Sequence, residues 1–555
     1  MISTTKKSKN NAIFSSSSPK YIFVTGGVMS GLGKGILSSS ISVILQSRGY
    51  KVEPIKIDGY LNVDAGTMNP IEHGEVFVLD DGTECDMDLG NYERFLDTSL
   101  SNNNSITTGK IMQMVLEKER KGEYLGKTVQ MIPHVTGEIK NQIRVAAKKS
   151  NADFVVVEIG GTVGDLENQM FIEAAREIHS EEPKNSVAFV HLTLVPIMGV
   201  VGEQKSKPTQ HSIKELQHMG IRPNIIVARS EKKLEEKIIN KIKLFGDVRH
   251  VISDPDLKSI YEAPLFFEQE GLMGAIDDIL NLTPKKSNLI EWNSFVENLK
   301  DGEKTITIAI TGKYVELHDA YTSIFESLAH ATAKNRVKYN IKWIETTDLT
   351  LDATKNALND VDGIIVPGGF GSRGIEGKIK CITYARENNI PFLGLCYGMQ
   401  LATIEFARNV CGFEDANTPE VNKNTLHPVI HVMESQKDIK NLGGSMRLGA
   451  YPAVIKKDTI VHVLYGKTDV SERHRHRYEV NPDYIDAIES KGLKFSGKSP
   501  DGTLMEFLEL PTHPFFVATQ AHPEFKSRPL LPHPLFNGFV NACAKKIAIL
   551  QKTAN

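Results

Sequence analysis

The chain has 555 residues, of which 40% are hydrophobic and 24% charged, and its formal net charge is -3. This length exceeds a single hydrophobic core and predicts about three or four domain-sized units with the composition of an ordinary globular protein. The charge excludes the strongly basic surface of a nucleic-acid-binding protein, and no apolar run reaches the ~18 residues of a membrane span.

The N-terminal residues 1–19 are predicted to form a disordered tail. They carry three lysines and a serine run at 15–18, and they lack the apolar core of a secretory signal. An organelle transit peptide is the alternative. The five cysteines are scattered and form no CxxC pair, which argues against a disulfide framework and a zinc site. We therefore expect a cytoplasmic protein that binds neither membranes nor nucleic acid.

Short β-branched runs alternate with longer helical patterns along the chain, which is typical of parallel sheets covered by helices. The polar stretch 282–304 interrupts this alternation, and we interpret it as an interdomain linker. The sequence therefore predicts two α/β domains, residues 20–281 and 305–550, each built on a doubly wound parallel sheet. The expected strands cover residues 21–25, 52–57, 154–159, 187–195, 225–228, 305–310, 363–366, 392–395 and 515–519.

A glycine-rich loop, GGVMSGLGKG at residues 26–35, follows the first expected strand and precedes a helical pattern. The backbone N–H groups of such a loop bind phosphate, and Lys34 adds a positive charge. The loop departs from the usual GxxxxGK[ST] order because Gly35 stands in place of the hydroxyl residue that binds magnesium. Another group must therefore hold the metal.

Two carboxylates are candidates for that metal. Asp88 lies in an acidic run, and Glu158 ends an apolar strand, where a carboxylate points into the ligand crevice of a parallel sheet. Magnesium prefers one or two such carboxylates together with phosphate oxygens. Asp165 either joins this site or caps the next helix. The run KSKPTQH at 205–211 is a second polyphosphate candidate, with a solvated charged loop as the alternative.

The second half of the chain contains a cysteine on a predicted sharp turn. A short apolar strand at 392–395 runs into GLCYG, so that Gly394 and Gly398 stand two positions either side of Cys396. This is the cysteine form of the nucleophile elbow, in which the thiol lies near a helix N-terminus that favours the thiolate. A buried structural cysteine is the alternative.

Two further motifs favour the catalytic interpretation of this cysteine. His522 and Glu524 follow directly on an expected strand, so that His522 can act as general base towards Cys396 while Glu524 orients the imidazole. The loop PGGFG at 367–371 follows another strand, and one of its N–H groups together with that of Tyr397 can form an oxyanion hole. The three motifs together predict one thiol acyl-transfer site.

These motifs (PGGFG, GxCxG and HPE) resemble the class I glutamine amidotransferase domain over residues 305–550. The resemblance implies that Cys396 attacks the side-chain amide of glutamine, releases ammonia and forms a glutamyl thioester that water hydrolyses. A free amino acid also needs a cation for its carboxylate and an anion for its ammonium group. The glutamine-binding residues that the resemblance implies are Gly369, Tyr397, Gly398, Met399, Gln400, Glu420 and Arg477.

The first half of the chain resembles the synthetase domain of the CTP synthase family, and the resemblance extends over about residues 20–550. It implies that ATP phosphorylates O4 of UTP, that ammonia attacks C4, and that phosphate then leaves to give CTP. The runs that carry the resemblance are 21–35, 62–78, 157–166, 205–211, 366–371, 442–449 and 472–480.

The same resemblance implies a role for each matching residue. The residues implied for ATP and its transferring phosphoryl group are Gly31, Leu32, Gly33, Lys34, Gly35, Ile36, Lys56 and Asp88. Magnesium would be bound by Asp88 and Glu158. The residues implied for UTP and CTP are Ser30, Asp165, Leu166, Glu167, Lys205, Ser206, Lys207, Pro208, Thr209, Gln210 and Lys241.

The resemblance further implies an ammonia route along Pro70, His73 and Val76, although the residues of this run by themselves favour a packed surface loop. It implies a homotetramer that GTP activates and CTP inhibits. Two features depart from the family: the long N-terminal tail, and a short segment at about 430–441 near the glutaminase entrance.

Three alternative functions fit the sequence less well. A corrin diamide synthase also joins a modified phosphate loop to a glutaminase-like half, but the runs 62–78 and 205–210 argue against it. A partitioning-type ATPase with a decayed partner domain predicts lost catalytic residues, whereas the cysteine, histidine and glutamate are intact. A nucleic-acid patch at 472–479 would be short and flanked by acidic residues in a negatively charged chain.

Overall fold

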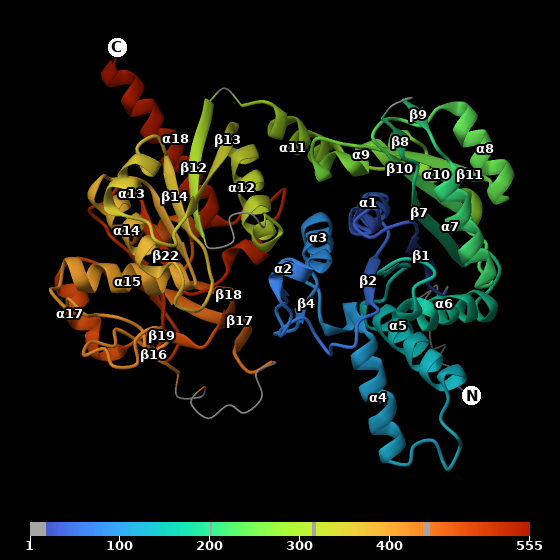
Figure 1. The fold of residues 1–555 in the computed structure, drawn as a ribbon, viewed down its shortest axis with the longest axis horizontal. Helices are drawn as coiled ribbons and strands as arrows, with labels where there is room; N and C mark the ends of the chain where they lie inside the picture. The colour runs from blue at the N-terminus through green and yellow to red at the C-terminus, as the bar shows by residue number, and fades with distance from the viewer. Residues whose placement is uncertain are drawn as a thin grey trace, which may run out of the picture.

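The computed structural model describes residues 18–199, 202–302, 304–312, 318–433, 436 and 444–554. Within these residues the chain forms two α/β halves, each around its own large sheet, and the halves lie side by side (Figure 1). We call residues up to 302 the N-terminal half and residues from 304 the C-terminal half. Most of the predicted tail and most of the segment 430–441 lie outside the described residues.

The N-terminal half is built on seven parallel strands in the order β11-β10-β7-β1-β6-β2-β5. Its central strands are apolar along their whole length because a parallel sheet is covered on both faces. In β1, Ile22 and Val24 pack into one buried cluster while Tyr21 and Phe23 pack into another. The strands are β1 (Lys20–Gly26), β2 (Val52–Asp58), β5 (Ser105–Thr107), β6 (Phe154–Ile159), β7 (Val187–Leu194), β10 (Ile225–Ser230) and β11 (His250–Pro255).

Helices cover both faces of this sheet, as a doubly wound fold requires. α1, α9 and α10 pack into the cluster that contains Ile22, whereas α4, α5 and α6 pack into the cluster that contains Phe23. The helices are α1 (Lys34–Ser47), α2 (Pro70–His73), α3 (Met87–Leu96), α4 (Thr108–Arg120), α5 (Thr136–Ser150), α6 (Gln169–Glu181), α7 (Lys207–His218), α8 (Glu236–Gly246), α9 (Ala263–Gln269) and α10 (Leu272–Leu280). Two small hairpins pair β3 (Phe77–Val78) with β4 (Glu84–Cys85) and β8 (Ile197–Met198) with β9 (Glu203–Gln204).

The C-terminal half is built on a nine-stranded sheet in the order β13-β12-β14-β15-β22-β21-β20-β17-β18. The five strands from β13 to β22 are parallel, as predicted. The other four extend the sheet in antiparallel fashion, and the sequence analysis named none of them. The strands are β12 (Lys304–Gly312), β13 (Val337–Glu345), β14 (Gly363–Val366), β15 (Phe392–Leu395), β17 (Arg447–Ile455), β18 (Asp469–His476), β20 (Lys494–Lys498), β21 (Met505–Glu509) and β22 (Phe516–Thr519).

Helices also cover both faces of the second sheet, since Phe392 of β15 packs with α14 and α15 while Leu393 packs with α12 and α18. A separate hairpin pairs β16 (Ile430–Val432) with β19 (Tyr478–Val480). The helices of this half are α12 (Thr322–Asn335), α13 (Leu351–Leu358), α14 (Ile375–Glu387), α15 (Tyr397–Asn409), α16 (Ile460–Tyr465), α17 (Ile485–Ser490) and α18 (Pro534–Ala554).

The predicted linker, residues 282–304, contains the helix α11 (Ile290–Lys300). Trp292, Phe295 and Val296 lie on one face of this helix and are buried in the core of the N-terminal half. The indole N–H of Trp292 donates a hydrogen bond to the carbonyl of Tyr261 at 2.8 Å. The segment that joins the two sheets is therefore packed against the first of them.

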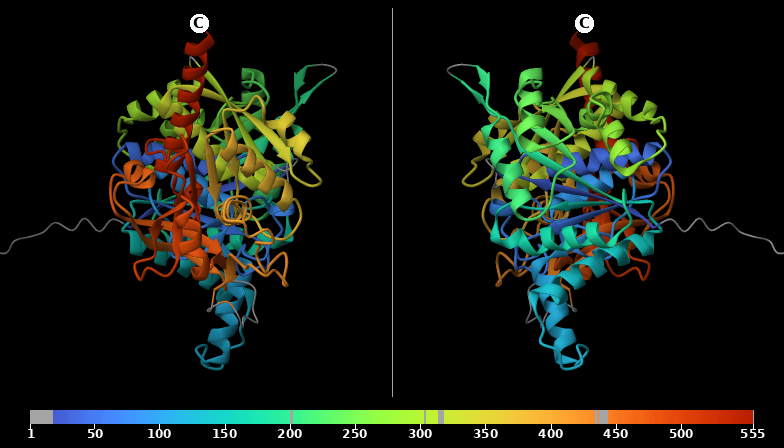
Figure 2. Two further views of the ribbon diagram at one scale, coloured as in Figure 1. Left: turned by 90° about the vertical axis from the view of Figure 1, so that its left-hand side faces the viewer. Right: turned by 90° about the vertical axis from the view of Figure 1, so that its right-hand side faces the viewer.

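The two side views show α4 projecting from the body of the N-terminal half and α18 extending beyond the body of the C-terminal half (Figure 2). Over the part of the chain that the structure describes, no helix is both long enough and apolar enough to cross a bilayer.

Candidate functional site

The glycine-rich loop 26–35 lies at the carboxyl end of β1 and leads into α1. Gly31 and Gly33 have positive φ angles of 76° and 100°, which glycine adopts without steric cost. Lys34 is buried, and its Nζ donates a hydrogen bond to the carbonyl of Gly161 at 2.7 Å. Burial lowers the pKa of Lys34. The loop thus offers backbone N–H groups and one cation, as predicted for a phosphate site.

Four carboxylates surround the amino group of Lys56 beside this loop. Its Nζ is hydrogen-bonded to Asp88 and lies 3.2 Å from Oε1 of Glu158. The carboxylates of Asp58 and Asp86 lie 3.7 and 3.8 Å from the same atom. Burial alone would lower the pKa of Lys56, but the carboxylates raise it well above its usual value. Negative charge exceeds positive charge here, which suits a cation-binding site.

The two predicted magnesium ligands, Asp88 and Glu158, both contact Lys56, and burial raises the pKa of Glu158. Within the described residues no group of three or more His, Cys, Asp or Glu side chains is arranged so that it could hold a metal ion by itself. Because Mg²⁺ commonly takes one or two carboxylates and completes its shell with water and phosphate oxygens, this pair fits the ion. The hydroxyl of Tyr92 donates a hydrogen bond to Glu158 and orients it.

The sequence analysis missed other residues around the phosphate loop. Asp58 ends β2 just as Glu158 lies near the end of β6, so the same end-of-strand argument would have identified it. A pocket of about 200 Å³ also adjoins Gly31 and is lined by Arg229 and Asp254, which pair at 3.2 Å. Its remaining lining is largely apolar, as in sites that hold a planar organic group.

The predicted pyrimidine-nucleotide residues occupy separate loops of the N-terminal half. The carboxylate of Asp165 accepts a hydrogen bond from the N–H of Thr162 at 2.9 Å, so it closes a turn rather than capping a helix. The run 205–210 enters α7, where Thr209 donates to the carbonyl of Leu194 at 2.9 Å. Gln210 donates to the hydroxyl of Ser206 at 3.0 Å. The lysines at 205, 207 and 241 lie on or beside the same helix pair, α7 and α8.

Cys396 occupies the strained turn between β15 and α15 that the sequence predicted. Its φ and ψ angles are 49° and -100°, an uncommon conformation for any residue with a side chain. A Cβ atom on Gly398 would lie 2.1 Å from the carbonyl oxygen of Val366, and one on Gly394 would lie 2.8 Å from the Cβ atom of Ala518. Both positions therefore require glycine, and the thiol stands at the N-terminus of α15.

His522 and Glu524 lie beside this cysteine. The Nδ1 atom of His522 and Oε1 of Glu524 are 2.7 Å apart. A Cβ atom on Gly368 would lie 2.9 Å from Cε1 of His522 and 3.6 Å from Cβ of Cys396, so both side chains face that glycine. Burial alone would lower the pKa of His522, but the charges of Cys396 and then Glu524 raise it to about 10. The geometry is that of a cysteine beside a histidine that a carboxylate orients.

The loop that follows β14 lies against the predicted glutamine-binding residues. Oε1 of Glu420 accepts the N–H of Gly371 at 2.7 Å, and the hydroxyl of Tyr397 donates to the carbonyl of Gly371 at 3.2 Å. Gln400 donates to the carbonyl of Tyr478 at 2.8 Å. Met399 is fully buried. The sequence analysis missed Gln520, whose side-chain N–H lies 3.6 Å from Sγ of Cys396.

Arg477 follows β18, and its guanidinium donates to Gln436 at 3.0 Å and to the hydroxyl of Ser445 at 2.9 Å. It thus lies among residues that border the segment 430–441. Most of that segment lies outside the described residues, so the prediction that it is shorter than in the family stays a prediction.

The predicted ammonia-route run lies at the interface of the two halves. The carboxylate of Glu75 accepts hydrogen bonds from the N–H group of Ser323 at 3.0 Å and from its hydroxyl. Val76 is buried, and the ring of His73 lies edge-on to Tyr60 at 6.1 Å. The backbone of Pro70 begins α2. The run therefore contacts the C-terminal half through Glu75, and its role as an ammonia route stays a prediction.

Comparisons with known proteins identify a family for each half of the chain. Residues 20–282 match the family described as CTP synthase N-terminus, and residues 316–542 match glutamine amidotransferase class-I. A CTP synthase of Thermococcus kodakarensis is 57% identical over 530 residues, which cover 95% of this chain and 99% of that protein. Those of Methanocaldococcus jannaschii and Halalkalibacterium halodurans are 54% and 52% identical, over 94% and 95% of this chain and 98% and 99% of their own lengths.

Among solved structures, the glutaminase domain of Trypanosoma brucei CTPS with bound acivicin is 39% identical over 43% of this chain and 94% of that chain, with a TM-score of 0.41. The two family matches together cover most of the chain, and the curated relatives match along nearly their full lengths. The chain therefore belongs to the CTP synthase family of glutamine-hydrolysing ligases, which form CTP from UTP, ATP and glutamine.

Proposed function

We propose that the two halves of this chain divide CTP synthesis between them, with residues 305–550 as the glutaminase domain, residues 20–281 as the synthetase domain and residues 282–304 as their linker. The observation that carries the proposal is the strained backbone of Cys396 beside the His522–Glu524 pair. A side chain held at a positive φ angle is costly, and such strain is concentrated at functional sites.

In the glutaminase domain, the Cys396 thiolate attacks the side-chain carbonyl carbon of glutamine. The N–H groups of Tyr397 and Gly369 receive the developing oxyanion. His522 gives its proton to the leaving amide nitrogen, so that ammonia departs and a glutamyl thioester remains. His522 then takes a proton from the water that attacks the thioester, which releases glutamate and restores the thiolate beside the protonated His522. Glu524 keeps the imidazole in the required orientation throughout.

The glutamine substrate is held by groups around this thiol. Glu420, already oriented by the N–H of Gly371, receives the α-ammonium group, and Arg477 receives the α-carboxylate. Gly398, Met399 and Gln400 form the wall of the site at the start of α15.

In the synthetase domain, the loop from Gly31 to Ile36 binds the phosphates of ATP through its N–H groups. Lys34 and Lys56 stabilise the γ-phosphoryl group while it passes to O4 of UTP. Ammonia then attacks C4, and phosphate leaves. Asp88 and Glu158 hold the magnesium ion, which neutralises phosphate charge when bound. The pocket beside Arg229 and Asp254 is the place for the adenine ring.

UTP binds through the lysines and the polar groups at the start of α7, together with the loop after β6. CTP occupies the same triphosphate contacts and inhibits, while GTP activates the glutaminase. Ammonia passes along Pro70, His73 and Val76, which lie where the two domains meet. The active form is a homotetramer. It works in the cytoplasm, a reducing compartment in which five free cysteines are expected. The residues proposed for the pyrimidine nucleotide are Ser30, Asp165, Leu166, Glu167, Lys205, Ser206, Lys207, Pro208, Thr209, Gln210 and Lys241.

The proposal is tested by following UTP conversion to CTP by absorbance, first with glutamine and then with an ammonium salt. Each reaction is run with and without GTP, and with magnesium or with a chelator. We expect CTP from both nitrogen sources, a GTP effect on the glutamine reaction alone, and loss of both reactions in the chelator. CTP formation that needs no ATP would contradict the synthetase mechanism.

A further inference from the structure

The backbone of β18 contacts the glutaminase residues directly. The N–H of His522 donates a hydrogen bond to the carbonyl of Arg473 at 2.7 Å. Sγ of Cys396 lies 3.8 Å from the carbonyl oxygen of Arg475. A displacement of this strand would therefore move the imidazole relative to the thiol.

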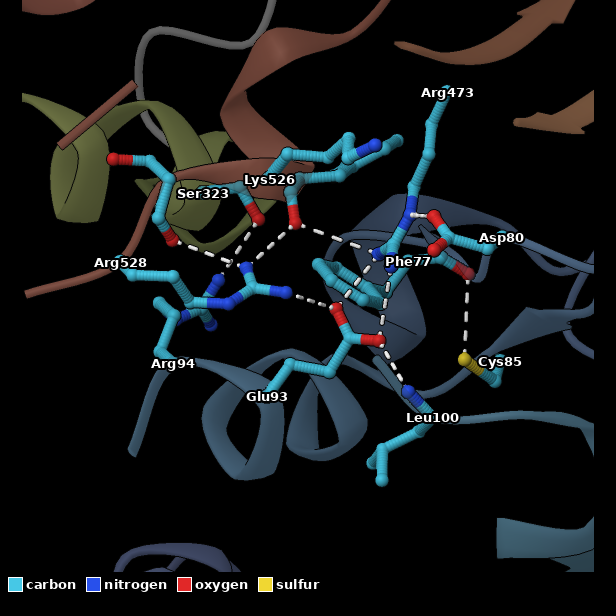
Figure 3. A network of polar contacts seen from close by, with 12 residues as sticks. Phe77, Asp80, Cys85, Glu93, Arg94, Leu100, Ser323, Arg473, Lys526 and Arg528 are labelled. Atoms are coloured by element: carbon cyan, nitrogen blue, oxygen red, sulfur yellow. Dashed lines mark hydrogen bonds and ion pairs between the residues drawn. The ribbon is translucent and has the colours of Figure 1, made fainter. Parts of the chain in front are cut away.

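The side chains of the same two arginines extend into the N-terminal half. Arg473 donates to both carboxylate oxygens of Glu93, at 2.7 and 3.0 Å, and to Asp80 at 2.6 Å (Figure 3). Arg475 donates to Glu84 at 2.8 Å. Alternate side chains of a strand point to the same face, so both arginines leave β18 on the side of the synthetase domain.

Glu93 also binds the segment that follows the His–Glu pair. Its Oε2 accepts a hydrogen bond from Arg528 at 2.9 Å, and Arg528 donates to the carbonyls of Phe525 and Ser527 at 3.1 and 3.2 Å. The ring of Phe525 stacks on the imidazole of His522, with centroids 5.2 Å apart. The carboxylate of Glu93 thus connects to two segments that contact the catalytic histidine: β18, and the chain that follows the His–Glu pair.

The centre of this network is closed to water, whereas Asp80 at its edge is 35% exposed. The side chains of Glu93 and Arg473 are both 0% exposed, and the Phe77 ring lies 5.4 Å from the Arg473 guanidinium and edge-on to Phe525 at 5.0 Å. Buried charges are costly to leave unpaired, so removing the charge of Glu93 leaves its two arginines to find new partners. Arg473 would keep its partly exposed partner Asp80, and Arg528 would keep only backbone carbonyls. Because both guanidinium groups lose their buried anion, we expect the backbone segments that carry them to shift.

We propose that Glu93, on helix α3 of the synthetase domain, is a positioning residue for the glutaminase site: through Arg473 it holds the strand that accepts the N–H of His522, and through Arg528 it holds the chain that follows the His–Glu pair. The inference rests on the proposed roles of Cys396 and His522. Helix α3 also carries Asp88, so the proposed ATP site and the glutaminase site share one helix.

The test is Glu93→Gln, which keeps the shape of the side chain and removes its charge. We expect kcat for glutamine hydrolysis to fall at least tenfold with a smaller rise in KM, because Glu420 lies outside β18 and outside the segment that Arg528 holds, whereas Arg477 directly follows β18. Ammonia-dependent CTP synthesis should stay within twofold of the wild type. Alkylation of Cys396 by iodoacetamide, followed by peptide mass spectrometry, should slow at least fivefold, since the thiolate loses its aligned imidazolium.

The matched control is Glu405→Gln, which removes another 0% exposed carboxylate that pairs with an arginine, Arg386, at 2.9 Å but has no contact with the β18 network. We expect this variant to keep glutamine hydrolysis and Cys396 alkylation within twofold. If Glu93→Gln does not fold by circular dichroism, Arg473→Lys carries the same test, because it retains the charge and loses the two-pronged contact.

Unchanged glutamine hydrolysis in Glu93→Gln overturns the inference, as does an equal loss in both Glu→Gln variants. A wild-type enzyme that makes no CTP from ammonia would instead refute the proposed function, so the two failures are distinguishable.

Discussion

The carboxylate of Asp88 fills the space that a side chain at Gly35 would need. A Cβ atom on Gly35 would lie 2.0 Å from Oδ1 of Asp88, well inside van der Waals contact. The usual phosphate loop places a magnesium-binding hydroxyl at this position. Here the carboxylate of α3 takes that place, which explains why the loop ends in glycine.

This contact predicts the effect of Gly35→Ala. The added methyl group should displace Asp88 from Lys56 and lower CTP synthesis from both glutamine and ammonia by about 10²-fold, as a displacement of about 1 Å can do at an active site. Steady-state rates with each nitrogen source measure the loss. Gly137→Ala is the control, because nothing lies within 4 Å of a Cβ atom there, and it should keep wild-type rates.

Lys34→Ala should also abolish synthesis from both nitrogen sources. The lysine lies at the end of the phosphate loop, and losing such a contact to a transferring phosphoryl group costs about 10²–10³ in rate. CTP formation with ammonium salt measures the loss without the glutaminase. A near wild-type rate in that assay would remove Lys34 from the ATP site.

Cys396→Ala should separate the two activities. The thiol serves only the release of ammonia, so glutamine-dependent CTP formation should disappear while ammonia-dependent synthesis stays close to the wild-type rate. The two assays, with circular dichroism as a folding control, measure this. If a folded variant loses both activities, the role of Cys396 extends beyond the glutaminase.

Val76→Phe should uncouple the two sites. Val76 is buried at the interface, and a phenyl ring there would obstruct the proposed path of ammonia. Glutamine hydrolysis should persist while the CTP formed per glutamine falls, and external ammonia should be less affected if it enters elsewhere. One CTP per glutamine in the variant, measured as CTP against glutamate, would exclude this position from the route.

Glu75→Gln should change how stability depends on pH. Burial raises the pKa of Glu75 to about 7, although hydrogen bonds from Ser323 act in the opposite direction. In the unfolded chain the pKa of this carboxyl group is about 4.5. Between pH 4.5 and 7 the folded protein therefore keeps a proton on Glu75 that the unfolded chain has lost. The contribution of Glu75 to stability is present below pH 4.5 and is lost as the pH rises through 7. The loss is up to about 3 kcal/mol.

The glutamine side chain carries no proton to lose, so the variant should gain on the wild type by up to that amount between pH 4.5 and 8. Urea unfolding at both pH values measures the difference. An equal pH dependence in the two proteins would show that Glu75 ionises normally in the folded state.

The sequence by itself determined the local sites. The phosphate loop, the cysteine elbow and the His–Glu pair are each contiguous runs in which a strand, a tight turn and the reactive residue follow one another. The order of residues in such a run is visible in the sequence, because glycine marks the turns at positions 31 and 33 and flanks the cysteine at positions 394 and 398. The contacts that exclude a side chain at 394 and 398 come from Ala518 and Val366 on neighbouring strands. The alternation of strand and helix likewise predicted the parallel sheet of the N-terminal half and the parallel part of the second sheet, apart from β13.

Only the tertiary structure decided what links these sites. Glu93 and Arg473 are 380 residues apart and meet because two separately built halves dock through a buried interface. No periodicity in the sequence encodes such a pair, since each residue by itself is as consistent with a solvated surface as with a buried contact. The carboxylates around Lys56, the antiparallel strands beyond β22 and the packing of α11 were decided in the same way. These contacts depend on which surfaces of the chain pack against one another and exclude water, and only the folded chain brings those surfaces together.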